Sequence, residues 1–208
     1  MIWAVLLLMA GAFGLLTYLV KTNPSFATDL QITQSVQLIR HPAFAWCISL
    51  VSWPGFTPQV VIGAGLITLW LVGLGLRWEA VAALAAALAS TALNGLVKDL
   101  IQRPRPLPSQ VNVVAALTSY SFPSGHVMFY VTFFGFLGFL ALCLLQPSPK
   151  RTVLLVLLGG LIAFIGLSRI YLGEHWASDV LGSYLLGSLL LAAIIQFYRW
   201  GKVRFVSK

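Results

Sequence analysis

Long apolar runs alternate along the chain with short polar or proline-containing breaks. A helix needs about 20 mostly apolar residues to cross the hydrocarbon core of a bilayer. Runs that approach this length predict six spans, at about residues 2–20, 59–76, 80–101, 124–145, 152–168 and 176–200. The pattern therefore predicts an all-α, polytopic membrane protein with a six-transmembrane-helix bundle.

Residues 21–58, between the first two spans, are more polar and more broken than the rest of the chain. Within them Phe26, Leu30, Thr33 and Leu38 fall loosely on one side of a helix, which predicts a small interfacial helix region. The first run lacks a basic segment before it and a small-residue cleavage site after it, which favours a retained span over a signal peptide. The pattern contains no linker or repeat, so we expect residues 1–208 to form a single membrane-embedded domain.

Composition agrees with a membrane protein and excludes other classes. The chain is 59% hydrophobic and 9% charged, whereas soluble domains carry about 25% charged residues. Disorder is excluded because it requires low hydrophobicity and a high density of charge. The net charge of +8 would suggest nucleic acid for a soluble protein, but basic residues at the ends of spans set membrane topology instead, so no nucleic-acid partner is expected. Cys47 and Cys143 lie in apolar surroundings and indicate neither a disulfide framework nor a cysteine metal site.

Basic residues also predict an orientation. If the N-terminus is cytoplasmic, the inner loops and the tail carry Arg77, Lys150, Arg151, Arg199, Lys202, Arg204 and Lys208. The outer side retains Lys21 and Arg40 once the cations of three polar segments, described next, are set aside. The positive-inside rule then places both termini in the cytoplasm and the ends of the third and fifth spans on the outer face of the cell (plasma or inner) membrane.

Three polar segments interrupt the apolar pattern at the ends of spans. They are KDLIQRPRP (residues 98–106), PSGH (residues 123–126) and SRIYLGEHWASD (residues 168–179). The third and fifth spans end on the same side, so the three segments can meet at one membrane face. Charged residues near lipid usually mark function. Snorkelling anchors are the alternative for single cations and explain Arg103 equally well, but anchoring explains neither the two histidines nor the aspartate.

All three segments contain groups suited to a phosphate. Ser124 precedes the fourth span as a natural N-cap, and Gly125 allows close approach of the backbone. The start of that helix would then offer N–H groups and a favourable dipole to an anion. Lys98, Arg105 and Arg169 can neutralise phosphate oxygens, the arginines as planar forks. We expect these five residues to bind the phosphate.

The remaining groups indicate catalysis. His175 and Asp179 are four residues apart and would share one face of a helix. The carboxylate can then hold one ring nitrogen and direct the other toward a substrate. His126 supplies a second imidazole from another segment, whereas His41 has no such neighbours and is interpreted as structural. The set has no carboxylate pair for a two-metal site and its cations would repel a metal ion, so we expect no metal and no cofactor.

The segments resemble the motifs of the type-2 phosphatidic acid phosphatase superfamily of integral-membrane lipid phosphatases. The family pattern is K-x6-R-P, then P-S-G-H, then S-R-x5-H-x3-D. The matching positions here, all in order and spacing, are Lys98, Arg105, Pro106, Pro123, Ser124, Gly125, His126, Ser168, Arg169, His175 and Asp179. The motifs run from Lys98 to Asp179, and the six-span plan extends the resemblance over nearly the whole chain.

This resemblance implies metal-independent hydrolysis of a lipid phosphate or diphosphate at the outer membrane–water interface. In the implied mechanism His175 forms a phosphohistidine, Asp179 orients it, and His126 protonates the leaving group and then activates water. Bacterial relatives, including phosphatidylglycerophosphatase B-like and undecaprenyl diphosphate phosphatase-like enzymes, act on undecaprenyl diphosphate, phosphatidylglycerol phosphate or phosphatidic acid; the first is the preferred expectation. The hydrophobicity of the chain argues against the soluble vanadate-dependent haloperoxidases of the same family.

Two other functions stay open at this point. A phosphohistidine could pass its phosphoryl group to a lipid or sugar hydroxyl instead of water, which would make the protein a lipid phosphotransferase. A non-enzymatic anion or lipid transporter could use the same cations for binding, but it predicts helix breaks near the bilayer midplane, whereas the breaks here lie at the ends of spans. The expected partners under each hypothesis are a lipid phosphate and the membrane lipids.

Overall fold

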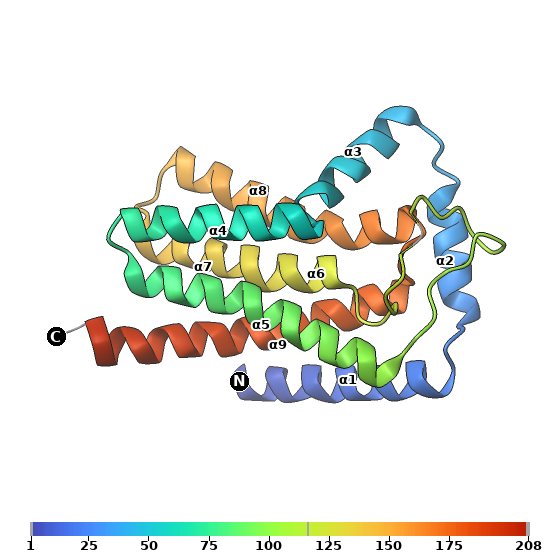
Figure 1. Ribbon diagram of the computed structural model, residues 1–208, viewed down its shortest axis with the longest axis horizontal. Helices are drawn as coiled ribbons and strands as arrows, with labels where there is room; N and C mark the ends of the chain where they lie inside the picture. The colour runs from blue at the N-terminus through green and yellow to red at the C-terminus, as the bar shows by residue number, and fades with distance from the viewer. Residues whose placement is uncertain (1, 116, 207–208) are drawn as a thin grey trace.

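A computed structural model describes residues 2–115 and 117–206 (Figure 1). Within these residues the secondary structure is helical, with connecting loops and no strand. The helices are α1 (Ile2–Thr22), α2 (Ala27–Gln37), α3 (Pro42–Ser52), η1 (Trp53–Gly55), α4 (Thr57–Gly73), α5 (Arg77–Ile101), α6 (Gly125–Phe129), η2 (Tyr130–Phe134), α7 (Gly135–Leu144), α8 (Pro149–Tyr171), α9 (Ala177–Gly201) and η3 (Lys202–Val206). The expected all-α class is confirmed.

Most of the long helices lie side by side as a bundle (Figure 1). Five helical segments of the described chain are long and apolar enough to cross a membrane: α1, α5, α8, the α6-to-α7 segment and the α9 segment extended to Arg204. A sixth crossing is available if the bent pair of Pro42–Gly55 and Thr57–Gly73 forms one span. The chain is therefore an integral membrane protein of the expected polytopic type.

The segment between the first two spans holds two helices where the sequence predicted one small interfacial region. The first, α2, lies across one end of the bundle (Figure 1). The second, α3, leads into α4 through a bend of 61°. His41 caps α3, because its Nδ1 accepts a hydrogen bond from the Ala43 N–H at 3.2 Å. The predicted second span is thus preceded by a helix that is apolar but only 11 residues long.

The fourth span forms the centre of the bundle. It runs as α6, the π-helical turn η2 and α7, and it buries Tyr130, Phe133 and Phe136 almost completely. Thr132 in the π-turn donates a hydrogen bond to the Gly187 carbonyl of α9 at 3.3 Å. Single π-turns inside α-helices are frequent near functional sites. Here the turn lies one helical segment after Gly125 and His126, at the start of the same span.

Small residues bring α5 close to its neighbours. Ala82, Ala83 and Ala86 are fully buried along it, and side chains of this size allow membrane helices to approach closely. At its C-terminal end, the Lys21 ammonium of α1 donates hydrogen bonds to the carbonyls of Leu100 and Ile101 at 2.8 and 3.2 Å. This contact ties the end of α1 to the end of α5, where the first polar segment begins.

The three polar segments lie at one end of the bundle. The connections from α5 to α6 and from α8 to α9 meet there, beside α2, while α9 runs away to the opposite end (Figure 1). This is the arrangement that the order of the spans predicts.

Candidate active site

The three polar segments surround a cavity of about 330 Å³. Lys98, Arg105, Gly125, His126 and His175 all line it. Its other walls come from α4, α5, α6 and the bend before α4, with apolar side chains such as Phe56, Val60 and Phe129. The structure thus brings together motif residues that are up to 77 positions apart in sequence, counted from Lys98 to His175.

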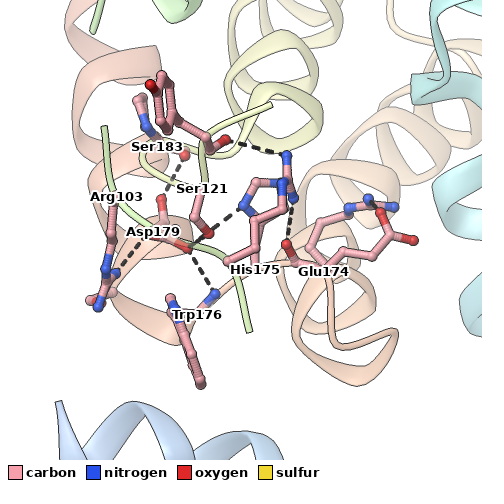
Figure 2. Close-up of polar contacts among 12 residues, drawn as sticks. Arg103, Ser121, Glu174, His175, Trp176, Asp179 and Ser183 are labelled. Atoms are coloured by element: carbon pink, nitrogen blue, oxygen red, sulfur yellow. Dashed lines mark hydrogen bonds and ion pairs between the residues drawn. The ribbon is translucent and has the colours of Figure 1, made fainter. Parts of the chain in front are cut away.

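His175 lies in the short loop between α8 and α9, and its side chain is 2% exposed. Its Nε2 is 3.2 Å from Nη1 of Arg105, and its Nδ1 is 3.6 Å from Oδ2 of Asp179. A guanidinium can only donate hydrogen bonds, so Nε2 must accept and the ring proton lies on Nδ1. His175 therefore directs its Nδ1–H toward Asp179 and its Nε2 lone pair toward Arg105. Figure 2 shows how His175 lies beside Asp179.

The electrostatic surroundings keep His175 neutral. Burial lowers the pKa of His175 well below its usual range, and the positive charges of Arg105, Lys98 and Arg169 lower it further. Burial also lowers the pKa of Arg105 to about 10, although the charge of Asp179 opposes this change. At neutral pH the site therefore combines an uncharged imidazole with a charged guanidinium.

Asp179 is fully buried, and both of its carboxylate oxygens are held (Figure 2). Oδ2 accepts hydrogen bonds from the Ser121 hydroxyl at 2.5 Å and from the Trp176 N–H at 2.8 Å. Oδ1 accepts one from Nη1 of Arg103 at 2.6 Å. The bond from Trp176 belongs to the first turn of α9, where the dipole favours a carboxylate. The carboxylate plane is therefore fixed with Oδ2 on the side of His175.

Lys98 and Arg105 converge on the loop before α6. The Lys98 ammonium donates to the Tyr120 carbonyl at 2.5 Å and lies 3.4 Å from the Ser119 hydroxyl. Arg105 donates through Nε to the Ser119 carbonyl at 2.6 Å and through Nη1 to the Glu174 carbonyl at 2.5 Å. These backbone contacts fix both cations beside the cavity.

Arg169 is also fully buried, at the end of α8. Its Nη1 donates to the hydroxyl of Ser52 in α3 at 2.7 Å, and Nη2 forms an ion pair with Glu174. Its Nε, the Ser124 hydroxyl and Nε2 of His126 are buried and find no hydrogen-bond partner in the described part of the chain. Buried polar groups are normally paired. His126 lines the cavity, whereas Ser124 and Arg169, both expected from the sequence to bind the phosphate, are not among its lining residues. The unpaired Nε2 of His126 is suited to a ligand with oxygen atoms.

The turn that carries Ser124 and Gly125 is held by α5. Asn94 donates through Nδ2 to the Pro123 carbonyl at 3.0 Å. A Cβ atom on Gly125 would lie 3.1 Å from Oδ1 of Asn94, so glycine permits this approach. Ser124 occupies the N-cap position as expected, but its hydroxyl makes no capping hydrogen bond. The hydroxyl is therefore buried and unpaired in the described part of the chain, one residue before Gly125, which lines the cavity.

His126 packs against the bend between α3 and α4. Its ring meets Phe56 edge-on, with 5.1 Å between the ring centroids. A Cβ atom on Gly55 would lie 2.2 Å from the His126 ring, so a larger residue there would displace the imidazole. The bend thus forms one wall of the site.

A sequence model of the PAP2 superfamily matches residues 79–202, more than half of the chain, and this range contains all three polar segments. The chain belongs to the PAP2 superfamily. It is 28% identical over 191 residues to phosphatidylglycerophosphatase B of Bacillus subtilis, covering 89% of this chain and 90% of that protein. It is 33% identical over 147 residues to the putative undecaprenyl-diphosphatase YbjG of Escherichia coli, covering 69% of this chain and 70% of that protein.

A solved PAP2 structure has the same fold. The crystal structure of the transmembrane PAP2-type phosphatidylglycerolphosphate phosphatase from Bacillus subtilis superimposes with a TM-score of 0.82 and 26% sequence identity. The match covers 94% of this chain and 96% of that one. These relatives are named as lipid phosphatases, and the expected family and enzyme class are confirmed.

Several residues of this PAP2 site were not identified from the sequence. They are Asp29, Ser52, Gly55, Phe56, Ser121 and Glu174, together with Arg103, for which anchoring was an equal alternative. Glu174 lies inside the third motif, directly before His175, so its position was the available signal. Asp29 is one of only five acidic residues in the chain. The rarity of acidic residues was the available indication that Asp29 has a role, although its segment was interpreted as interfacial.

Proposed function

We propose that this PAP2 protein hydrolyses a lipid phosphate or diphosphate through a phosphohistidine on His175, without a metal ion. The observation that carries the proposal is the state of His175. The ring is neutral, its Nε2 lone pair lies beside a fixed guanidinium, and its Nδ1 proton faces a fixed carboxylate. A neutral ring whose Nδ1 proton faces a carboxylate is the arrangement that an activated nitrogen nucleophile requires. The Arg105 N–H that bonds Nε2 must pass to a phosphoryl oxygen to free the lone pair for attack.

In the first step Nε2 of His175 attacks phosphorus, and the bond from phosphorus to the lipid oxygen breaks. His126 donates a proton to that leaving oxygen. Asp179 stabilises the positive charge that forms on the His175 ring. A bound phosphate brings negative charge next to His126, which favours the protonated form that this step requires.

In the second step His126 takes a proton from water as the water oxygen attacks phosphorus. The phosphorus–nitrogen bond breaks, inorganic phosphate leaves, and His175 returns to its neutral form. In both steps the phosphoryl oxygens are held by Lys98, Arg105, Arg169, the Ser124 hydroxyl and the Gly125 N–H, which stabilise the developing charge.

The cavity lies at one end of the bundle, so an apolar tail can stay in the bilayer while the phosphate reaches the cations. The positive-inside rule assigns Arg77, Lys150 and Arg151 to the inner side, which gives cytoplasmic termini and an active site on the outer face of the cell membrane. The names of the relatives support two candidate substrates, phosphatidylglycerol phosphate and undecaprenyl diphosphate. The motif resemblance adds phosphatidic acid as a third.

The test is phosphate release by the detergent-purified protein in excess EDTA from each of these three lipids. His175→Ala is the inactive variant, and His41→Ala is the matched control because His41 caps α3 outside the site. We expect release by the wild type and His41→Ala and none by His175→Ala, together with an acid-labile phosphoenzyme on His175. Activity in His175→Ala, or activity lost in EDTA and restored by one metal, would overturn the mechanism. Transfer of labelled phosphate to an acceptor lipid without release would favour phosphotransfer.

A further inference from the structure

A buried cation joins Asp179 to a second carboxylate behind the catalytic site. The Arg103 side chain is 0% exposed, and it forms ion pairs with Oδ1 of Asp179 at 2.6 Å and with Oδ2 of Asp29 at 2.8 Å. Its Nε donates to the Pro24 carbonyl at 3.0 Å, and its guanidinium lies 5.3 Å from the ring centre of Phe26. Neither Arg103 nor Asp29 lines the cavity.

Asp29 also accepts hydrogen bonds directly from the first turn of α9. Its Oδ1 accepts the N–H of Ser178 at 2.8 Å, and its Oδ2 accepts the Ser178 hydroxyl at 2.5 Å. The same hydroxyl accepts a hydrogen bond from Nη1 of Arg103 at 2.7 Å. A carboxylate from α2 therefore satisfies a first-turn N–H of α9, one residue before Asp179.

These contacts fix the orientation of the Asp179 carboxylate. Oδ1 is engaged by Arg103, and Oδ2 by Ser121 and Trp176. Rotating the carboxylate would break bonds on both sides, so Arg103 helps to keep Oδ2 toward His175. Figure 2 shows Arg103 and His175 on opposite sides of Asp179.

The charges of Arg103 and Asp29 also determine how strongly Asp179 interacts with His175. Arg103 alone would draw the negative charge of Asp179 away from His175. Asp29 supplies a second carboxylate to the same guanidinium, so the charge of Asp179 stays available to the imidazolium that forms during attack. In a site excluded from water such charges interact strongly.

We propose that Arg103 and Asp29 are positioning residues for phosphoryl transfer, with Arg103 fixing the Asp179 carboxylate and Asp29 fixing and neutralising Arg103. This assigns a role in catalysis to α2, the helix between the first two spans. The inference rests on the proposed phosphohistidine mechanism. Since both residues lie behind the cavity, they affect the transition state and leave binding of the substrate nearly unchanged.

The central variant is Asp29→Asn, which keeps the size of the side chain and removes its charge. We expect kcat to fall about tenfold or more, as for other residues that orient a reactive group, with KM within about twofold of the wild type. Inhibition by vanadate, which mimics the trigonal-bipyramidal transition state, should weaken in parallel, while inhibition by inorganic phosphate should not change.

Thr33→Val is the matched control on the same helix. Thr33 is fully buried, and within the described residues its hydroxyl bonds only to the Asp29 carbonyl of its own helix, at 2.9 Å. We expect nearly wild-type kcat and vanadate inhibition from it. If Asp29→Asn folds poorly in detergent, Ser178→Ala removes the hydroxyl bonds to both Asp29 and Arg103 and should lower kcat by a smaller factor, again without changing KM.

A double-mutant cycle separates positioning from general stability. In the Asp179→Asn background, Asp29→Asn should cause no further loss, because there is no Asp179 charge left to position. Additive losses in the cycle would overturn the inference, as would wild-type kcat in Asp29→Asn or in Ser178→Ala. Activity in His175→Ala would overturn the proposed mechanism and this inference together, whereas an inactive His175→Ala beside an unaffected Asp29→Asn would overturn this inference alone.

Discussion

Nη1 of Arg105 lies 3.2 Å from Nε2 of His175 and assigns the tautomer of that ring. A guanidinium donates and never accepts, so the neutral imidazole carries its proton on Nδ1, toward Asp179. The fork of Arg105 is itself held by the carbonyls of Ser119 and Glu174. One side chain thus orients the lone pair of His175 and places a positive charge beside it.

The first prediction concerns the guanidinium group of Arg105. Arg105→Lys keeps the charge but cannot bond Ser119, Glu174 and His175 in one plane. We expect kcat/KM for phosphate release to fall by about 10²–10³-fold, the usual effect of removing one preorganised donor. Arg40→Lys, at an exposed position in the loop before α3, is the control and should behave as the wild type. A loss no larger than that of the control would mean that Arg105 supplies only charge.

The second prediction concerns pH. Burial and the neighbouring cations lower the pKa of His175 below its usual value of 6.5. The protonated ring cannot attack, so a lowered pKa moves the loss of activity to lower pH. We expect kcat/KM, which reports the free enzyme, to be maintained as the pH falls through 6.5.

The variant Arg105→Gln tests the cause of this shift. It removes the charge that most depresses the pKa of His175 after burial, so the acid limb of its residual activity should move up toward pH 6.5. The measurement is the pH profile of kcat/KM for both proteins. A wild-type acid limb at or above the ordinary histidine value would contradict the neutral, buried state of His175.

The spans and the motif residues could be predicted from sequence because each depends on local pattern. An apolar run near 20 residues indicates a crossing wherever it occurs, and Lys98 is conspicuous as a cation within the last turn of such a run. The helix α3 was missed for the same reason. Its 11 residues are apolar but too short to cross a membrane, and nothing local predicts the 61° bend that follows it.

The supporting residues of the site could not be predicted because they depend on tertiary position. Arg103 is two residues from Arg105 and has the same charge, yet it points behind Asp179 and not into the cavity. Its partner Asp29 is 74 positions earlier in the chain. Ser121 is one of several hydroxyl residues in its loop, and only the fold shows that it faces Asp179.

The third prediction concerns the loop that carries His175. Gly173 has a φ of +66°, in the left-handed region that side chains avoid, and a Cβ atom there would lie 2.1 Å from the backbone oxygen of Asn112. Gly173→Ala therefore combines backbone strain of about 1 kcal/mol with a clash that the backbone cannot easily relieve. We expect a lower unfolding temperature in detergent and a loss of phosphate release.

The control for this variant is Gly160→Ala in α8. Apart from the backbone of α8 itself, no atom of the described chain lies within 4 Å of the added Cβ at that position, and alanine is the better helix former by about 1 kcal/mol. We expect an unchanged or slightly higher unfolding temperature and unchanged activity. Equal behaviour of the two variants would show that the loop before His175 can shift without cost to the site.

The fourth prediction concerns Glu174, whose buried carboxylate forms an ion pair with Arg169. If Arg169 binds the phosphate as proposed, the phosphate shares its guanidinium with this carboxylate. Glu174→Gln removes the competing charge while keeping the size of the side chain. We expect inorganic phosphate to inhibit this variant about tenfold more strongly than the wild type, the order expected for one charge–charge contact in a partly solvated site.

The matched control is Glu79→Gln. Glu79 is also a buried glutamate paired with a cation, Lys202, but it lies at the other end of α5 and bonds the Tyr198 hydroxyl at 3.0 Å. Its substitution should leave the inhibition constant of phosphate unchanged. Unchanged or weaker inhibition in Glu174→Gln would mean that Glu174 mainly holds Arg169 in place. In that case kcat/KM and the affinity for inorganic phosphate should both fall. Removal of a competing carboxylate instead predicts tighter binding of inorganic phosphate and slower release of the product.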